Sequence, residues 1–267
     1  MRGVLYAGFG LCVLACHRPA PTPSVSGASG ATSQRPAASN GSTPLAPINP
    51  ASPTLPRTPD LALNPERAEA FLRKLCVTEG DLSEHLSVTA PKMRCVQVES
   101  AGDQAKLRFR YDGVSAERTA LKSGAVREQL GIKLRARDTC NLLYVMWRFT
   151  PKAELVVSFK DNPGESTHDE CENRGYTNLV PTTKAPPPAV VPGGQYELSA
   201  RIEGGRLRAW IDNQLVWEGL LPEGVRNLAG PAGVRSDNVA WSMLDFDVGA
   251  GAPMHAPASL PNCRNRR

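Results

Sequence analysis

The feature that most constrains the fold is an alternation of apolar and polar residues that begins shortly after Met93. Segments 95–98, 107–111 and 132–136 read Cys-Val-Gln-Val, Leu-Arg-Phe-Arg-Tyr and Ile-Lys-Leu-Arg-Ala. A period of two is typical of half-buried strands, because successive side chains point to opposite faces of a sheet. Further strands are predicted at residues 141–149, 154–159, 196–202, 206–212, 215–217 and 240–248.

Turn-forming residues separate these segments, and no helical pattern lies between them. They include Pro151 and residues 162–164, 192–194, 204–205 and 230–233. Many short strands joined by turns favour an antiparallel sandwich or barrel. The span is too long for a small immunoglobulin-like module, so we expect an all-β, two-sheet antiparallel jelly-roll sandwich at residues 95–250.

One short helix is predicted before the sandwich, at residues 64–76. Asn64 is a good N-cap, and Pro65 suits the first helical position. A short apolar stripe consists of Phe71, Leu72 and Leu75. We therefore expect segment 61–94 to pack on the sandwich as a helix and a lead-in.

Residues 16–60 have the composition of a disordered tether. Ten prolines lie between His17 and Asp60, among Ser, Thr, Ala and Asn. Such a stretch cannot bury enough apolar surface to offset its ordering entropy. Fully extended, it reaches on the order of 130 Å. Residues 251–267 are expected to form a flexible basic tail.

The net charge of +5 lies mostly outside the predicted sandwich. Arg2 carries one positive charge, and residues 17–60 carry a net two, which leaves +2 for residues 61–267. A near-neutral domain with no basic stripe interleaved with aromatic residues gives no indication of nucleic-acid binding.

The first 15 residues have the pattern of a secretory signal peptide. Arg2 precedes an apolar run at residues 3–14 that is too short to span a bilayer. The segment Val13-Leu14-Ala15-Cys16 resembles the lipobox of bacterial lipoprotein signal peptides. The resemblance implies that residues 1–15 are removed and that Cys16 carries diacylglycerol and an acyl chain such as palmitate. An ordinary cleaved signal peptide is the alternative.

The resemblance also implies that the protein is attached to a membrane and has a particular cellular location. Residue 17 is His and not the Asp that retains lipoproteins in the inner membrane. We therefore expect display at the outer membrane or the cell surface, and the periplasmic face is the alternative.

Export favours disulfide bonds among the remaining cysteines. The pairing with the shortest spacing joins Cys76 to Cys95 and Cys140 to Cys171, which leaves Cys263 unpaired, although four cysteines allow three connectivities. Zinc binding is the weaker alternative, because the chain has no Cys-x-x-Cys pair.

Segments 196–216, 230–236 and 244–248 resemble the terminal strands of the concanavalin A-like lectin/glucanase superfamily. The resemblance is closest to its laminin-G-like and 3-keto-disaccharide-hydrolase-like branch. It covers residues 195–248 well and 105–160 loosely. Its motifs belong to the scaffold, so it implies a jelly-roll fold and not an activity.

Alternation suggests a ligand-binding face on these last strands. In segment 206–212 it places Arg208 and Trp210 on the same face. In segment 240–248 it places Trp241 and Asp245 on the face opposite Leu244. Indole rings can stack on sugars while charged groups bind hydroxyls. Trp210, Trp241, Arg208 and Asp245 are therefore the candidate ligand-binding residues. Alternatively, the tryptophans cover a flank or pack beneath the helix and loops.

The loop at residues 161–176 is rich in oxygen ligands but matches no calcium-loop signature. Its acidic residues are Asp161, Glu165, Asp169, Glu170 and Glu172. A structural calcium ion is one possibility, and a solvent-facing loop held by a Cys171 disulfide is the favoured one. No other cofactor is expected.

No catalytic residue is predicted. The paired acids Glu-x-Asp-x-x-Glu of related glycosidases are missing, as is a Gly-x-Ser-x-Gly elbow. The leading hypothesis is a surface-displayed lipoprotein with a non-catalytic carbohydrate- or polymer-binding sandwich. A sugar-acting hydrolase and a structural interaction module of the envelope are the alternatives.

Overall fold

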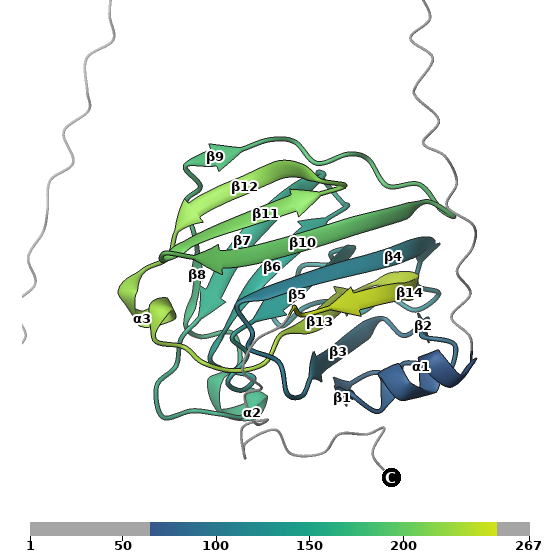
Figure 1. Ribbon diagram of the computed structural model, residues 1–267, viewed down its shortest axis with the longest axis horizontal. Coiled ribbons are helices and arrows are strands. Elements are labelled where there is room, and N and C mark those ends of the chain that lie inside the picture. The colour runs from purple at the N-terminus through teal and green to yellow at the C-terminus, as the bar shows by residue number, and fades with distance from the viewer. Residues whose placement is uncertain (1–64, 250–267) are drawn as a thin grey trace, which may run out of the picture. The chain divides into compact units, whose positions relative to one another are not determined.

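Two seven-stranded antiparallel sheets form the body of the protein in the computed structural model, which describes residues 65–249 (Figure 1). Sheet A contains, in spatial order, β1 (Leu75–Glu79), β3 (Lys92–Gln97), β13 (Gly233–Asp237), β5 (Gln129–Leu134), β6 (Leu142–Arg148), β7 (Glu154–Lys160) and β8 (Tyr176–Asn178). Sheet B contains β2 (Ser87–Val88), β14 (Val239–Asp247), β4 (Gln104–Val114), β10 (Gln195–Glu203), β11 (Arg206–Ile211), β12 (Gln214–Leu220) and β9 (Thr183–Lys184).

The chain crosses repeatedly between the sheets, so that β3 and β5 lie in sheet A while β4 lies in sheet B. In Figure 1, β10, β11 and β12 lie in front of β6 and β7. The predicted two-sheet antiparallel jelly roll is confirmed.

The core lies between the sheets and follows from the alternation. In β6, Leu143, Val145 and Trp147 are buried in the core. Trp147 makes edge-to-face contacts with Phe109 and Tyr196, at centroid distances of 6.0 and 5.5 Å. The alternate residues of the same strands point outward, and in sheet A they form the floor of the candidate site.

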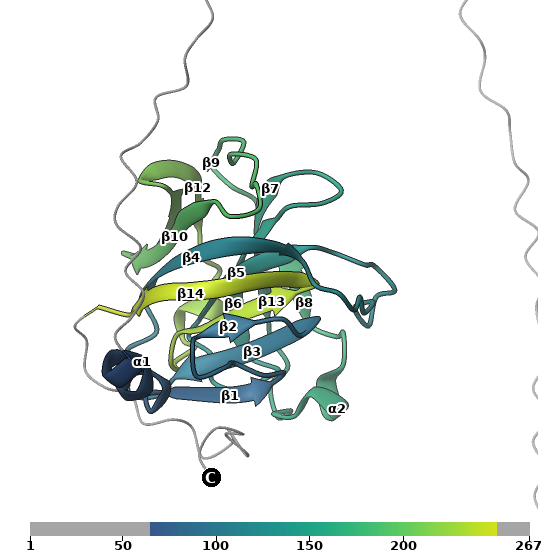
Figure 2. The same cartoon turned by 90° about the vertical axis from the view of Figure 1, so that its right-hand side faces the viewer.

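The helix α1 (Pro65–Leu72) is shorter than predicted and lies beside β1 in both views (Figure 1 and Figure 2). The expected continuation to residue 76 is wrong, because Cys76 lies in β1, opposite Val96 of β3. Pairing with β3 gives the backbone N–H and C=O groups of β1 hydrogen-bond partners, and Leu75 and Val77 enter the core. The lead-in segment thus contributes β1 and β2 to the sheets.

Two further helices of one turn each are described, α2 (His168–Cys171) and α3 (Glu223–Arg226). Between residues 65 and 249, no helix has both the length and the apolar character to cross a bilayer. The predicted signal peptide, Cys16, the tether, the basic tail and Cys263 lie outside the described residues.

One of the two predicted disulfides is confirmed and the other is wrong. Cys140 is bonded to Cys171. Cys95 is free and buried in the core, whereas Cys76 is itself disulfide-bonded. Because Cys76 points to the outer face of sheet A and Cys95 to the inner face, neighbouring strands do not bring their thiols together.

The central strand β13 was not predicted. It begins at Gly233, within a segment that we interpreted as a turn, and it pairs with β3 and β5. A Cβ atom at Gly233 would lie 2.1 Å from the carbonyl oxygen of Cys95, so only glycine permits this close pairing. The charged residues Arg235 and Asp237 follow in the strand, so its sequence does not read as an apolar segment.

The predicted faces of β14 hold for Phe246 and Val248, which enter the core, but they are wrong for Trp241 and Met243, because the strand contains two irregularities. Its pairing register with β4 shifts between Ala240 and Trp241 and again between Met243 and Asp245. A bulge moves the following residues to the other face. Trp241 is therefore wholly buried in the core, on the same side as Phe246.

Candidate ligand-binding groove

A groove with a volume of about 720 Å³ crosses the outer face of sheet A. All seven strands of the sheet contribute lining residues. These residues alternate with core residues, so that Tyr144, Met146 and Arg148 line the groove while Val145 and Trp147 are buried behind them. Residues 121–127 and 168–173 contribute further lining residues beyond the sheet.

The centre of the groove holds two arginines that share one buried carboxylate. Arg235 lies directly opposite Arg94 in the β3–β13 register. Asp237, which is 1% exposed, accepts a bond from Arg94 at 2.5 Å and one from Arg235 at 3.0 Å. Gln129 Nε2 also donates to Asp237, at 2.6 Å.

This arrangement fixes the charge of Asp237. Burial alone would raise the pKa of Asp237, but the guanidinium groups of Arg94 and Arg235 and the bond from Gln129 hold it well below its usual range. The carboxylate therefore stays ionised. It orients the two guanidinium groups but neutralises only one positive charge.

A tyrosine pair lies beside the arginines. The rings of Tyr144 on β6 and Tyr176 on β8 are stacked, with centroids 5.9 Å apart. The Arg235 guanidinium lies 4.8 Å from the Tyr144 centroid, and its Nη1 donates to the Tyr176 hydroxyl at 3.3 Å. Tyr144 is buried, whereas Tyr176 is 41% exposed. The Lys160 ammonium group also lies 5.3 Å from the Tyr176 centroid, so the exposed part of this ring is the aromatic surface that a ligand can reach.

Lys133 lines the groove from β5 and is only 6% exposed. It lies opposite Gly233 on β13 and Tyr144 on β6. Burial and the nearby charges of Arg94 and Arg235 lower the pKa of Lys133 to about 8, against the opposing effects of Cys95 and Glu79. No salt bridge or hydrogen bond of its ammonium group is found among residues 65–249.

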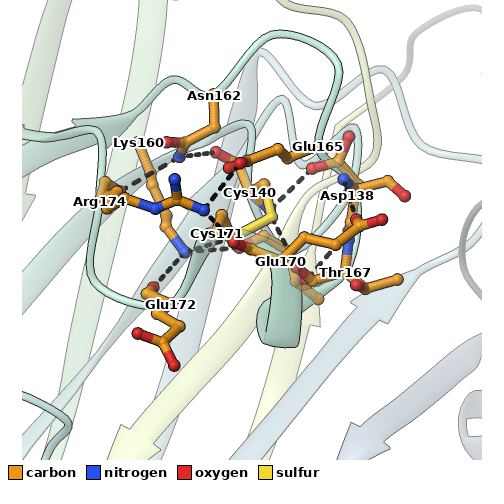
Figure 3. The surroundings of a disulfide bond; sticks show 12 residues. Asp138, Cys140, Lys160, Asn162, Glu165, Thr167, Glu170, Cys171, Glu172 and Arg174 are labelled. Atoms are coloured by element: carbon orange, nitrogen blue, oxygen red, sulfur yellow. Dashed lines mark hydrogen bonds and ion pairs between the residues drawn. A yellow bond between two sulfur atoms is a disulfide. The ribbon is translucent and has the colours of Figure 1, made fainter. Parts of the chain in front are cut away.

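A loop tied by a disulfide bond (Figure 3) contributes residues to the lining of the groove. Cys171 of α2 is bonded to Cys140, which precedes β6. The buried Lys160 donates to Cys171 Sγ and to the Glu172 carbonyl, each at 2.7 Å. These contacts position His168, Asp169 and Asn173 along the groove.

Two of the five acidic residues considered as calcium ligands, Glu165 and Glu170, have other partners in this loop. Glu165 pairs with Arg174 at 2.7 Å. Glu170 accepts bonds from the backbone N–H groups of Ser166 and Thr167 at the start of α2 (Figure 3). Within the described part of the chain, no group of three or more His, Cys, Asp or Glu side chains could hold a metal ion.

None of the four predicted ligand-binding residues lines this groove. Trp241 is in the core, and Arg208, Trp210 and Asp245 lie on sheet B. Arg208 pairs with Glu218 on the neighbouring strand, at 3.3 Å. One signal for the groove was present in the sequence, because Lys133 is a charged residue within the predicted strand at residues 132–136. Arg235 and Asp237 gave none, because their strand β13 was not predicted.

No family model matches the chain, and no curated protein matches it. Among solved structures, it is similar to the carbohydrate-binding module CBM66 from Bacillus subtilis, with 11% identity and a TM-score of 0.43, over 65% of this chain and 93% of that one. It is also similar to a tetrameric galectin from the ball sponge Cinachyrella sp., with 10% identity and a TM-score of 0.37, over 60% of this chain and 100% of the galectin. Because both TM-scores are below 0.5, neither likeness carries weight in assigning a ligand.

Proposed function

We propose that the protein binds a carbohydrate polymer in the groove of sheet A without turning it over. The observation that carries the proposal is the exposed ring of Tyr176, backed by Tyr144 and flanked by hydrogen-bonding side chains in an open groove. Sugar rings pack on aromatic faces while their hydroxyls bind polar groups. Arg235, Ser158 and Asn178 are suitable polar groups on the same floor.

The dimensions of the groove suit a chain rather than a single sugar. Strands spaced by roughly 4.8 Å make a seven-stranded sheet about 29 Å wide. The volume of about 720 Å³ is within the usual range for ligand sites. A groove of this kind also argues against a purely structural module with a sealed surface.

The carboxylates of the groove favour binding over hydrolysis. Three acids line it: Glu79, Asp138 and Asp169. Asp138 accepts bonds from Cys140 N and Asn141 Nδ2, and Glu79 faces Arg94 at 3.7 Å. Glycoside hydrolysis needs one carboxyl that donates a proton and another that attacks or activates water. The acids Asp245 and Asp247 lie on the other sheet.

Replacement of Tyr176 by alanine tests this function. Loss of the exposed aromatic face is expected to weaken binding of a positive glycan from an array by roughly 3- to 10-fold. Trp210→Ala, which removes a half-buried aromatic ring from sheet B, is the matched control and should leave binding unchanged. Equal loss in both variants, or no binding to any glycan, would contradict the proposal.

We also propose that Cys16 anchors this domain to a membrane through lipid, at the outer membrane or cell surface. Support comes from the segment Val13-Leu14-Ala15-Cys16 and the polar, proline-rich stretch after it. The Cys16→Ser protein should move from the membrane to the soluble fraction on cell fractionation, because no acyl chain can then be attached. Cys12→Ser is the control, and membrane association that survives Cys16→Ser would refute the anchor.

A further inference from the structure

We propose that the groove of sheet A selects acidic polysaccharides, whose sugars carry carboxylate or sulfate groups. This inference rests on the proposed carbohydrate-binding function and adds the substrate class. It comes from the charge of the groove, from a buried cation that lacks a counterion, and from the contrast with the rest of the domain.

Positive charge is concentrated in the groove and not spread over the domain. Residues 65–249 contain 24 Lys and Arg and 25 Asp and Glu, a net charge of −1. The groove, in contrast, is lined by seven of these cations and three anions. Even if Asp237 and Glu154, which pair with lining arginines, are added, seven cations face five anions. The seven are Lys92, Arg94, Lys122, Arg127, Lys133, Arg148 and Arg235.

Several of these cations lack a counterion within the described part of the chain. Arg94 and Arg235 share Asp237, which leaves one positive charge between them, apart from the more distant Glu79. Arg127 and Lys133 form no ion pair there. The positive charges of Arg148 and Arg235, together with burial, lower the pKa of Arg127. An anion in the groove would relieve this repulsion.

Lys133 points most directly to a ligand. A buried ammonium group without a counterion is costly, and proteins rarely contain one unless something pairs with it. Here the ammonium group lines an open groove beside the tyrosine pair. A carboxylate or sulfate on a sugar that stacks on Tyr176 would supply the missing charge, and the guanidinium groups of Arg94 and Arg235 would add charge-assisted bonds.

Nucleic acid is a less suitable polyanion. Single-stranded nucleic acids bind to grooves in which several exposed aromatic rings stack successive bases. In this groove Tyr144 is buried, so Tyr176 is the exposed aromatic ring among the lining residues. A polymer of acidic sugars needs only one stacking surface and a row of cations.

The test compares two polymers that share one backbone. Full-length protein is titrated with polygalacturonate and with the same polymer after its carboxyl groups are reduced to alcohols. The acidic polymer should bind at least about tenfold more tightly. The difference should shrink as ionic strength rises from about 0.01 to about 1 M, because the Debye length falls from roughly 30 to 3 Å.

Two variants locate the effect. Lys133→Met should lower affinity for polygalacturonate by about tenfold, whereas Lys152→Met, an exposed lysine outside the groove lining, should not. Urea denaturation confirms that Lys133→Met folds.

The pH dependence of binding is a second test. In the wild-type protein, affinity should fall between about pH 7 and about pH 9 as Lys133 loses its proton, and this fall should be smaller in Lys133→Met. The charged and titratable groups around Lys133 are Arg94, Arg235, Glu79, Cys95 and Tyr144.

The outcomes separate the two proposals. Equal affinity for both polymers, or binding only to neutral glycans, would overturn acid selectivity and leave carbohydrate binding intact. Failure to bind any glycan would overturn both. Binding of single-stranded DNA as tight as that of polygalacturonate would replace acid-sugar selectivity with general polyanion binding.

Discussion

Asp237→Asn is expected to lower the free energy of unfolding by about 3–5 kcal/mol, the usual cost of removing one partner from a buried ion pair. Asp237 is 1% exposed and is the shared counterion of Arg94 and Arg235, which lie opposite each other on neighbouring strands. Without the carboxylate, two largely buried guanidinium groups would repel each other. Asparagine keeps the shape of the side chain and can still accept a hydrogen bond from Gln129. The loss of stability therefore measures the contribution of the negative charge.

The matched control is Asp112→Asn, which removes a similar pair from a more exposed site. Asp112 bonds to Arg110 at 2.6 Å, but both side chains are about a third exposed. Exposed pairs contribute roughly 0–1 kcal/mol. Urea denaturation at neutral pH measures both variants. A loss for Asp237→Asn no larger than that for Asp112→Asn would show that water or backbone groups satisfy the groove arginines without Asp237.

The pH dependence of stability gives a second measurement of the same carboxylate. The pKa of Asp237 is lower in the folded protein than in the unfolded chain, so its contribution is fully present above about pH 4. It is lost as the pH falls from there toward the folded-state pKa. The difference in stability between wild type and Asp237→Asn should therefore shrink as the pH is lowered from about 5 to about 2.

The strands of sheet B show what the sequence could predict. Residues 196–202 and 206–212 are bounded by Gly204 and Gly205, and they form β10 and β11 as predicted. In β11 the predicted faces also hold, because Leu207, Ala209 and Ile211 enter the core. The period-two pattern suffices where a strand is regular and one of its faces is apolar. The closing strand β14 differs, because its two register shifts leave no mark in the sequence.

The groove could not be predicted for a different physical reason. Its lining comes from seven strands that run from β1 to β13 in the sequence, and only the sheet order brings them to one face. Arg94 and Arg235 are neighbours although 141 positions separate them. The tryptophans were predicted to bind a ligand because indole rings can stack on sugars, but Trp241 is buried in the core. The charge of Lys133, within the predicted strand at residues 132–136, was the more informative signal.

The double variant Cys140→Ser/Cys171→Ser is expected to lose about 3–4 kcal/mol of stability, because the disulfide closes a loop with a sequence separation of 31 residues. It should also weaken glycan binding under conditions where the protein remains folded. The bond holds α2 against the start of β6, and His168, Asp169 and Asn173 of this segment line the groove. Lys160, which is buried, would lose its contact with Cys171 Sγ and keep its hydrogen bonds to the carbonyls of Thr139 and Glu172.

Cys95→Ala is the control for removal of a thiol. Cys95 is free and buried, so its loss should cost about 1 kcal/mol through a small cavity and leave the groove unchanged. Urea denaturation and binding to the array-positive glycan measure both effects. If the double variant lost stability but bound the glycan as tightly as wild type, the loop would be a structural element and not a wall of the binding site. If it lost neither, the Lys160 and Glu170 hydrogen bonds alone would hold the loop, since both remain in the variant.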